Sequence, residues 1–338
     1  MRPSALVALT IASLTAVVGC QDPAPSGQAD ADEATAGDTT DDNGSSSSEE
    51  GTSSSSDDGS SSSDSSDTGT DSGTDGSDSG TDSSDTGPIG SPGCMGGAGL
   101  EEGEHTFMLA GYDRRYVLRL PQNYDPSQPW PLIFALHGNG GTTDYWDEIG
   151  GDRDIRTAFA SEAIIVIPEA INNAWRDYNA PPETWPAGIE LELEYFDTVL
   201  AELREALCID DDNVFSMGFS GGGSFSGVLG CRREYIRAMA VGGSVIYFEA
   251  DQCVSAPASW ITIGDLELTA GREEFRDFFR DLAGCQESST PGSPDGCIDY
   301  EGCGADTPVT FCAHPGDHFW PSIGTDATHS FFAQFYNG

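Results

Sequence analysis

Short apolar runs recur along the chain from residue 132 onward, and each is too short to be a typical helix. Runs of this length without polar positions are typical of strands that a sheet buries on both faces. They comprise residues 132–136, 163–167, 214–217, 238–241, 260–263 and 309–312. Ahead of them, residues 106–109 and 114–120 flank Gly111, Tyr112 and Asp113, and this arrangement predicts a β-hairpin.

Two segments between these runs have the period of a helix instead. Residues 194–207 place apolar side chains three and four positions apart, and residues 272–282 form a second segment rich in Phe and Arg. Strands that alternate with helices indicate a mostly parallel sheet covered by helices on both faces. We therefore predict one α/β domain over residues 93–338.

The first 92 residues follow a different pattern. An apolar stretch over residues 5–18 follows Arg2 and is closed by Cys20, which is typical of a bacterial lipoprotein signal peptide. The pattern predicts that residues 1–19 are removed and that Cys20 carries the lipid; an ordinary signal peptide is the alternative. Residues 20–92 are mainly Ser, Asp, Gly and Thr, so they are predicted to be a disordered linker or a glycosylated stalk.

The charge balance of the chain is strongly acidic. Its formal net charge is −43, and all 14 basic residues are arginines. A field of this sign repels phosphate backbones, so the composition argues against nucleic-acid binding and against polyanionic substrates. The expected partners are a membrane, through the lipid on Cys20, and the substrate itself; the chain is expected to be a monomer.

The nine cysteines fit an exported protein that forms disulfides. Setting Cys20 aside leaves an even number, which is consistent with four bridges. The predicted pairs are Cys285–Cys312, Cys297–Cys303, Cys208–Cys231 and, by elimination, Cys94–Cys253. The spacing of Cys and His residues does not predict a zinc site.

A glycine-rich motif directly follows the apolar run 214–217. It reads Gly218-Phe219-Ser220-Gly221-Gly222, which matches G-x-S-x-G. After a strand, this motif predicts a nucleophile elbow, a sharp turn that exposes a serine hydroxyl above a sheet. A Gly/Ser-rich loop without chemistry is the alternative, but the position after a strand favours Ser220 as a nucleophile.

A serine nucleophile needs a general base. In α/β-hydrolases, which carry this elbow, the chain order is serine, acid, histidine, and three histidines follow Ser220. His318 comes just after the last predicted strand, so it is the predicted base. His314 is expected to be structural, and His329 is expected in a final helix.

Two carboxylates compete as the acid that orients this histidine. Asp265 and Glu267 both follow the apolar run 260–263, and either could accept the imidazole N–H. A carboxylate in a loop is often only solvated surface, so the residues alone leave both open.

The oxyanion donors are expected in the glycine-rich segment His137-Gly138-Asn139-Gly140-Gly141, which follows the apolar run 132–136. Its glycines allow backbone N–H groups to face a ligand. The predicted donors are the N–H groups of Asn139 and Gly221, with the backbone rather than the Asn139 side chain acting.

Three blocks of the chain together resemble a known enzyme group. They are Leu136-His137-Gly138-x-Gly140-Gly141, the elbow with Gly223 added, and Gly316-x-His318-x-Trp320-Pro321. The combination resembles the extracellular polyhydroxybutyrate depolymerases and the feruloyl and acetylxylan esterases, from about residue 104 to the C-terminus. The resemblance implies an α/β-hydrolase fold and a serine mechanism that needs no metal or organic cofactor.

The resemblance also bears on single residues. The usual acid motif of the group is His-Gly-x-x-Asp; it falls on residues 263–267 here, so it selects Glu267 over Asp265 while departing in residue type. Trp175 and Trp320 are candidates for the lining of the acyl pocket, with core packing as the alternative.

We therefore expect a secreted or surface-anchored serine carboxylic-ester hydrolase that acts through an acyl-enzyme. Its expected substrates are feruloyl or acetyl esters of polysaccharides, or hydroxyalkanoate esters. A serine peptidase of the same superfamily is one alternative. A non-catalytic surface-binding lipoprotein is another, because the acid motif is irregular.

Overall fold

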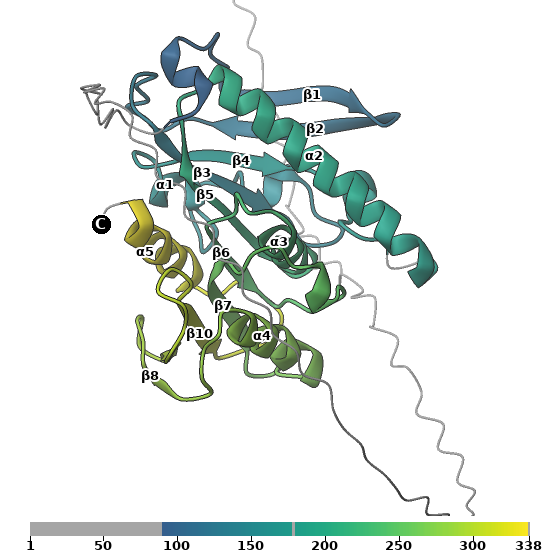
Figure 1. Cartoon of the computed structure of the whole chain (residues 1–338), viewed down its shortest axis with the longest axis vertical. Coiled ribbons are helices and arrows are strands. Elements are labelled where there is room, and N and C mark those ends of the chain that lie inside the picture. Colours follow the sequence, from purple (N-terminus) through teal and green to yellow (C-terminus); the bar gives the residue numbers. More distant parts are fainter. Residues whose placement is uncertain (1–89, 178–179, 337–338) are drawn as a thin grey trace, which may run out of the picture. The chain divides into compact units, whose positions relative to one another are not determined.

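The computed structural model describes residues 90–177 and 180–336. The predicted signal peptide, Cys20 and most of the predicted linker lie outside these residues. Within them, no helix is long and apolar enough to cross a membrane. The described chain forms one sheet of ten strands with helices packed against it (Figure 1).

The sheet is parallel in its centre and antiparallel at both edges. Its spatial order is β1-β2-β4-β3-β5-β6-β7-β10-β9-β8, and every pair from β4 to β10 in this order is parallel. In chain order the strands are β1 (Gly103–Leu109), β2 (Tyr112–Arg119), β3 (Trp130–Leu136), β4 (Ile164–Pro168), β5 (Ile209–Phe219), β6 (Ala238–Gly242), β7 (Ala258–Gly264), β8 (Ser289–Pro291), β9 (Cys297–Tyr300) and β10 (Val309–His314). The predicted α/β-hydrolase architecture is confirmed.

Strands β8 and β9 were not predicted from the sequence. Every residue of β8 is exposed and three of the four residues of β9 are only partly buried, so neither strand has the apolar run on which the prediction relied. They extend the sheet beyond β10 as a small antiparallel edge.

The helices cover both faces of this sheet. They are α1 (Ile155–Ala158), α2 (Trp185–Ala206), α3 (Gly221–Arg232), α4 (Ala270–Leu282) and α5 (Gly324–Tyr336), with 3-10 turns η1 (Pro92–Met95), η2 (Thr143–Tyr145), η3 (Ile171–Asn173), η4 (Pro182–Thr184) and η5 (Ala250–Gln252). Helix α2 begins at Trp185, well before the predicted residue 194. Pro186 is compatible with this start, because backbone N–H groups in the first helical turn have no acceptor within the helix and the missing N–H of proline costs no hydrogen bond there.

Alternation along the central strands separates two hydrophobic cores. In β3, Leu132, Phe134 and Leu136 pack with α2, α3 and α4, whereas Ile133 and Ala135 pack with α1 and α5. Figure 1 shows α2, α3 and α4 along one side of the sheet and α1 and α5 along the other. Successive strand side chains point to opposite faces, so a strand between two helical layers has to be apolar throughout.

Gly90 and Ser91, which precede the predicted domain, also pack against it. Gly90 forms a β-bridge with Asp210. The buried Ser91 hydroxyl donates to the Leu207 carbonyl at 2.7 Å and accepts the Ile209 N–H at 2.9 Å. These bonds attach the two residues to the beginning of β5, the strand that leads to the glycine-rich elbow.

Eight cysteines form four disulfides, but none of the predicted pairings is correct. The pairs are Cys94–Cys208, Cys231–Cys253, Cys285–Cys303 and Cys297–Cys312. The register of the antiparallel pair β9–β10 sets Cys297 directly opposite Cys312. Register of this kind depends on the folded sheet rather than on sequence spacing, so the sequence predicted the number of bridges and not their partners.

The Cys94–Cys208 bridge closes the longest loop of the four, with a sequence separation of 114. Replacing both residues with alanine is expected to lower the free energy of unfolding by about 4–5 kcal/mol, because a longer closed loop removes more entropy from the unfolded chain. Guanidinium denaturation measures this. The matched control is the Cys285/Cys303 pair, with a separation of 18, whose removal should cost about 3 kcal/mol. An equal or larger loss in the control would contradict the prediction.

Candidate functional site

Ser220 lies in the sharp turn between β5 and α3. The strand ends at Phe219 and the helix begins at Gly221, which leaves Ser220 with φ 57° and ψ −123°. A positive φ is unfavourable for a residue with a Cβ, so the turn is held by its surroundings. One such restraint is the hydrogen bond from the Ser220 N–H to the Gly242 carbonyl, at 2.8 Å.

Two glycines allow this turn to pack. A Cβ atom added to Gly218 would lie 2.5 Å from the carbonyl carbon of Gly222, and one added to Gly222 would lie 2.3 Å from the carbonyl oxygen of Leu136. Backbone atoms cannot rotate out of such a clash as a flexible side chain can. The glycines of the motif are therefore required by the close approach of β3, β5 and α3.

His318 follows β10 and reaches the serine. Its Nε2 atom lies 2.8 Å from Ser220 Oγ, and its ring packs against Phe219 with a centroid distance of 4.6 Å. The other two candidate histidines lie elsewhere. His314 is buried against Phe319, and His329 in α5 contacts Glu162 at 2.8 Å. Of the three candidate histidines, His318 is the one that contacts Ser220.

The carboxylate that meets His318 belongs to Glu267. Its Oε2 atom is hydrogen-bonded to His318 Nδ1, and its Oε1 atom accepts the Gly264 N–H at 3.3 Å. Glu267 is 7 % exposed, whereas Asp265 is exposed and its backbone N–H donates to the carbonyl of His314, outside the site. Of the two carboxylates that the sequence left open, the structure brings Glu267 to the imidazole.

The environment of Glu267 favours its ionised form. Burial raises the pKa of this carboxyl, but the hydrogen bond with His318 and the charges of His318 and Arg272 outweigh burial, so its pKa lies below the ordinary value. A hydrogen bond or a positive charge close to a carboxylate stabilises the charged form. An ionised Glu267 accepts a hydrogen bond from Nδ1–H, which leaves Nε2 of a neutral imidazole without a proton and able to accept one from Ser220.

Arg272 lies beside this pair and was missed by the sequence analysis. Its Nε atom is 3.3 Å from Glu267 Oε2, and a second guanidinium nitrogen donates to the Gly243 carbonyl. The one sequence signal was its position: it is the third residue of α4, where the helix dipole disfavours a positive charge. Composition alone did not distinguish it from the other arginines of that helix.

The glycine-rich segment after β3 lies against the serine. A Cβ atom added to Gly138 would lie 3.4 Å from Ser220 Cβ, and one added to Gly221 would lie 2.2 Å from Asn139 Oδ1. Among the residues that the structure describes, the N–H groups of Asn139 and Gly221 donate to no protein acceptor. The segment that carries Asn139 therefore packs against Ser220 and Gly221, and the two N–H groups stay the predicted oxyanion donors.

Asn173 holds this segment in place, which the sequence analysis also missed. The Gly140 N–H donates to the Asn173 carbonyl at 2.7 Å, and the Asn173 side-chain amide donates to the Gly141 carbonyl at 2.8 Å. Asn172 and Asn173 have φ values of 53° and 60°, a region that asparagine tolerates better than most residues. The pair of asparagines was the signal that could have revealed this turn.

Trp175 and Trp320 are packed in the core rather than exposed to a substrate. The Trp175 ring is 1 % exposed and its Nε1–H donates to the His137 carbonyl at 2.7 Å. Trp320 is 4 % exposed and meets Trp146 edge to face at a centroid distance of 5.1 Å. Their surroundings correspond to the core-packing alternative and correct the expectation that they line the acyl pocket.

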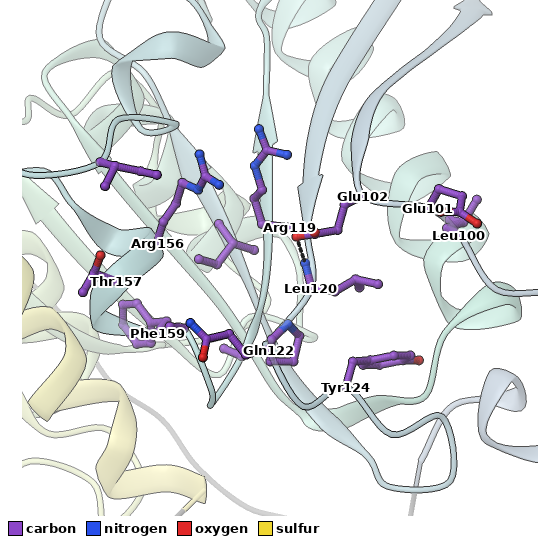
Figure 2. Close-up of a pocket in the computed structure, with 15 residues that line it drawn as sticks. Leu100, Glu101, Glu102, Arg119, Leu120, Gln122, Tyr124, Arg156, Thr157 and Phe159 are labelled. Carbon is purple, nitrogen blue, oxygen red and sulfur yellow. Dashed lines mark hydrogen bonds between the residues drawn. The ribbon is translucent and has the colours of Figure 1, made fainter.

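A cavity of about 760 Å³ lies apart from these groups. Figure 2 shows Arg119, Arg156 and Tyr124 on its wall, which is built from the segments before β1 and after β2 and from α1. Ser220, His318 and Glu267 are not among its lining residues. Both arginines form ion pairs with Asp147.

Solved structures with the same fold are esterases and related hydrolases. A ferulic acid esterase aligns with 70 % of this chain and 98 % of its own, with a TM-score of 0.50 and 17 % identity. An S-formylglutathione hydrolase from Agrobacterium tumefaciens aligns with 69 % of this chain and 94 % of its own, also with a TM-score of 0.50, and 13 % identity. At these identities the likeness concerns the fold alone.

Sequence relatives are more similar. Feruloyl esterase D of Neurospora crassa is 31 % identical over 261 residues, which are 68 % of this chain and 82 % of the relative. Feruloyl esterase C of Emericella nidulans is 30 % identical over 262 residues, 72 % of this chain and 90 % of the relative. No family model matches the chain. On the strength of these relatives and of the fold, the chain belongs to the feruloyl esterase family and is a carboxylic ester hydrolase.

Proposed function

We propose that the protein hydrolyses its esters through an acyl-enzyme on Ser220. The observation that carries this proposal is the continuous chain of contacts from Ser220 Oγ to His318 Nε2, at 2.8 Å, and from His318 Nδ1 to Glu267. A serine, a histidine and a carboxylate in this order are the arrangement that activates a serine hydroxyl in many hydrolases. In this proposal Ser220 is the nucleophile, His318 the base and Glu267 the acid.

Acylation moves one proton and exchanges one bond. As Ser220 Oγ attacks the ester carbonyl carbon, its proton passes to His318 Nε2. The tetrahedral intermediate then collapses, the bond to the alcohol oxygen breaks, and His318 returns the proton to that oxygen. Glu267 stabilises the imidazolium that exists between the two transfers and keeps the ring in the correct tautomer.

Deacylation repeats the same steps with water. His318 takes a proton from a water molecule, which attacks the acyl carbon, and the proton then returns to Ser220 as the acyl bond breaks. In the tetrahedral intermediates of both acylation and deacylation, the former carbonyl oxygen carries a negative charge. The Asn139 and Gly221 N–H groups adjoin Ser220 and would donate to that oxygen, an interaction that strengthens in the transition state.

The proposed substrates are feruloyl esters of polysaccharides. The relatives are named as feruloyl esterases, which supports this choice, and so does an aromatic ring near the histidine. Phe219 packs against His318, and Tyr145 lies parallel to Phe219 at a centroid distance of 6.4 Å. Phe219 is itself buried, so the partly exposed Tyr145 is the ring of this pair that suits the phenyl ring of a hydroxycinnamoyl group. Acetyl and hydroxyalkanoate esters are the competing acyl groups.

A hydrolysis screen tests the substrate. The value of kcat/KM for methyl ferulate is expected to exceed that for acetylated xylan and hydroxybutyrate oligomers by about tenfold or more, since only the aromatic acyl group can stack in the site. Ferulic anilide serves as the amide control and should remain intact. Preference for the oligomers would assign the enzyme to polyesters, and comparable anilide cleavage would favour the peptidase alternative.

Export of the protein is part of the proposal. Four disulfides fit an oxidising compartment, and reduced cytosolic proteins rarely contain them. Anchoring through lipid on Cys20 remains a proposal that rests on the sequence motif, since Cys20 lies outside the described residues. A lipid anchor and a long polar linker would hold the enzyme at a distance from the membrane that carries it.

A further inference from the structure

Arg272 joins three segments that converge on the proposed catalytic histidine. It projects from the first turn of α4 and contacts Glu267, in the loop after β7, at 3.3 Å. It also donates to the carbonyl of Gly243, in the loop after β6, and approaches His318 Nδ1 at 3.4 Å. The side chain is 16 % exposed, so these contacts are partly shielded from solvent.

The ion pair of Arg272 differs from those of its neighbours in α4. Arg276 and Arg280 pair with carboxylates of the helix itself, at positions 273, 277 and 281. Arg272 instead has its carboxylate partner outside the helix, and its charge lies at the helix end where the dipole opposes it. Positions that depart from a local rule of this kind are often functional.

The contact with Gly243 is a second indication that Arg272 acts on the proposed site. Gly243 has φ 58°, and a Cβ atom placed on it would lie 2.6 Å from His318 Cε1. The imidazole therefore rests directly on the Gly243 backbone, and Arg272 fixes the carbonyl of the same residue. The guanidinium thus contacts both the surface on which the ring packs and the carboxylate that orients the ring.

The proposal concerns how the acid is held. Glutamate has one more rotatable bond than aspartate, so it needs more restraint to present one oxygen to a histidine. Gly264 holds Oε1 and Arg272 contacts Oε2, the oxygen that accepts from His318. We propose that Arg272 is a positioning residue: the Gly243 carbonyl anchors its guanidinium, which fixes the Glu267 carboxylate so that His318 faces Ser220. This inference rests on the proposed acyl-enzyme mechanism.

The test compares Arg272→Gln, Arg272→Lys and Arg276→Gln on methyl ferulate. Arg272→Gln should lower kcat by about ten- to a hundredfold with KM within twofold, since misplacement of a catalytic group affects turnover more than binding. Arg272→Lys should recover part of the loss, because lysine keeps the charge but lacks the planar fork of arginine. Arg276→Gln, one turn along the same helix and equally exposed, should retain wild-type kcat and KM.

A double variant shows whether Arg272 acts through the acid. If it does, Arg272→Gln added to Glu267→Gln should lower kcat no further than Glu267→Gln alone. Three outcomes would each overturn the inference. The first is a double variant whose loss in kcat is the product of the two single losses. The others are an Arg272→Gln variant that raises KM without lowering kcat, and one that retains wild-type kcat. The Arg272→Lys variant carries the same test if Arg272→Gln does not fold. Full activity of Ser220→Ala would instead overturn the proposed mechanism, so the two failures are distinguishable.

Discussion

Replacing Ser220 with alanine is expected to lower kcat for methyl ferulate by about 10⁴- to 10⁶-fold, the loss that follows removal of a serine nucleophile in comparable triads. The hydroxyl oxygen is the atom that would bond to the acyl carbon, and alanine has no atom in its place. The fold should be retained, since alanine keeps the Cβ and the backbone bond to Gly242 is unaffected. Single-turnover assays together with thermal unfolding would measure both effects.

Ser226→Ala provides the matched control. Ser226 lies in the same helix α3, is buried, and its hydroxyl has no hydrogen-bond partner among the described residues. Its loss should therefore leave kcat within about twofold of the wild-type value, as for a residue with no part in the reaction. Retention of wild-type turnover in pure Ser220→Ala would show that another group performs the chemistry.

Glu267→Gln is expected to lower kcat by about 10³- to 10⁴-fold, comparable to the loss of a triad acid elsewhere. A neutral amide cannot balance the charge of the imidazolium. Its NH₂ group can also present a donor to Nδ1, which favours the tautomer that no longer accepts a proton from Ser220. The buried position of Glu267 gives solvent little opportunity to substitute for the lost carboxylate.

The neighbouring Asp265→Asn variant is the control for this prediction. Asp265 is exposed, and the side chains that contact the His318 ring nitrogens are those of Ser220, Glu267 and Arg272, so kcat should stay within about twofold of wild type. The steady-state kinetics of both variants, on methyl ferulate and with folding checked by circular dichroism, decide between the carboxylates. If Asp265→Asn lost most of its activity while Glu267→Gln remained active, Asp265 rather than Glu267 would be the acid.

The local pattern of the sequence was enough to predict the centre of the fold. Strands such as β3 and β7 are buried on both faces, so each contains an apolar run that can be recognised without knowing which strands lie beside it. Ser220 follows such a strand, and the short G-x-S-x-G motif directly encodes its strained turn. Chain order left three histidines, the position just after the last predicted strand selected His318, and the structure places it beside the serine.

Features set by tertiary contacts were less accessible. The choice of Glu267 depended on a resemblance, because the residues alone allowed Asp265 equally. Arg272 contacts Gly243 across 29 residues and Asn173 contacts Gly141 across 32, and the sequence around each residue does not show which distant loop it contacts. The disulfide partners depend on strand register for the same reason. Aromatic character likewise could not tell a buried Trp175 from one that faces a ligand.

The contact between Gly218 and Gly222 is made by main chain alone. The atoms that face both glycines belong to the main chain, and for Gly222 the nearest is the Leu136 carbonyl oxygen. These two contacts are therefore kept when side chains around the site are substituted. Evolution can therefore change the acyl group that the site accepts while Ser220 stays in place. Alanine at Gly218 or Gly222, by contrast, would displace the turn that carries Ser220.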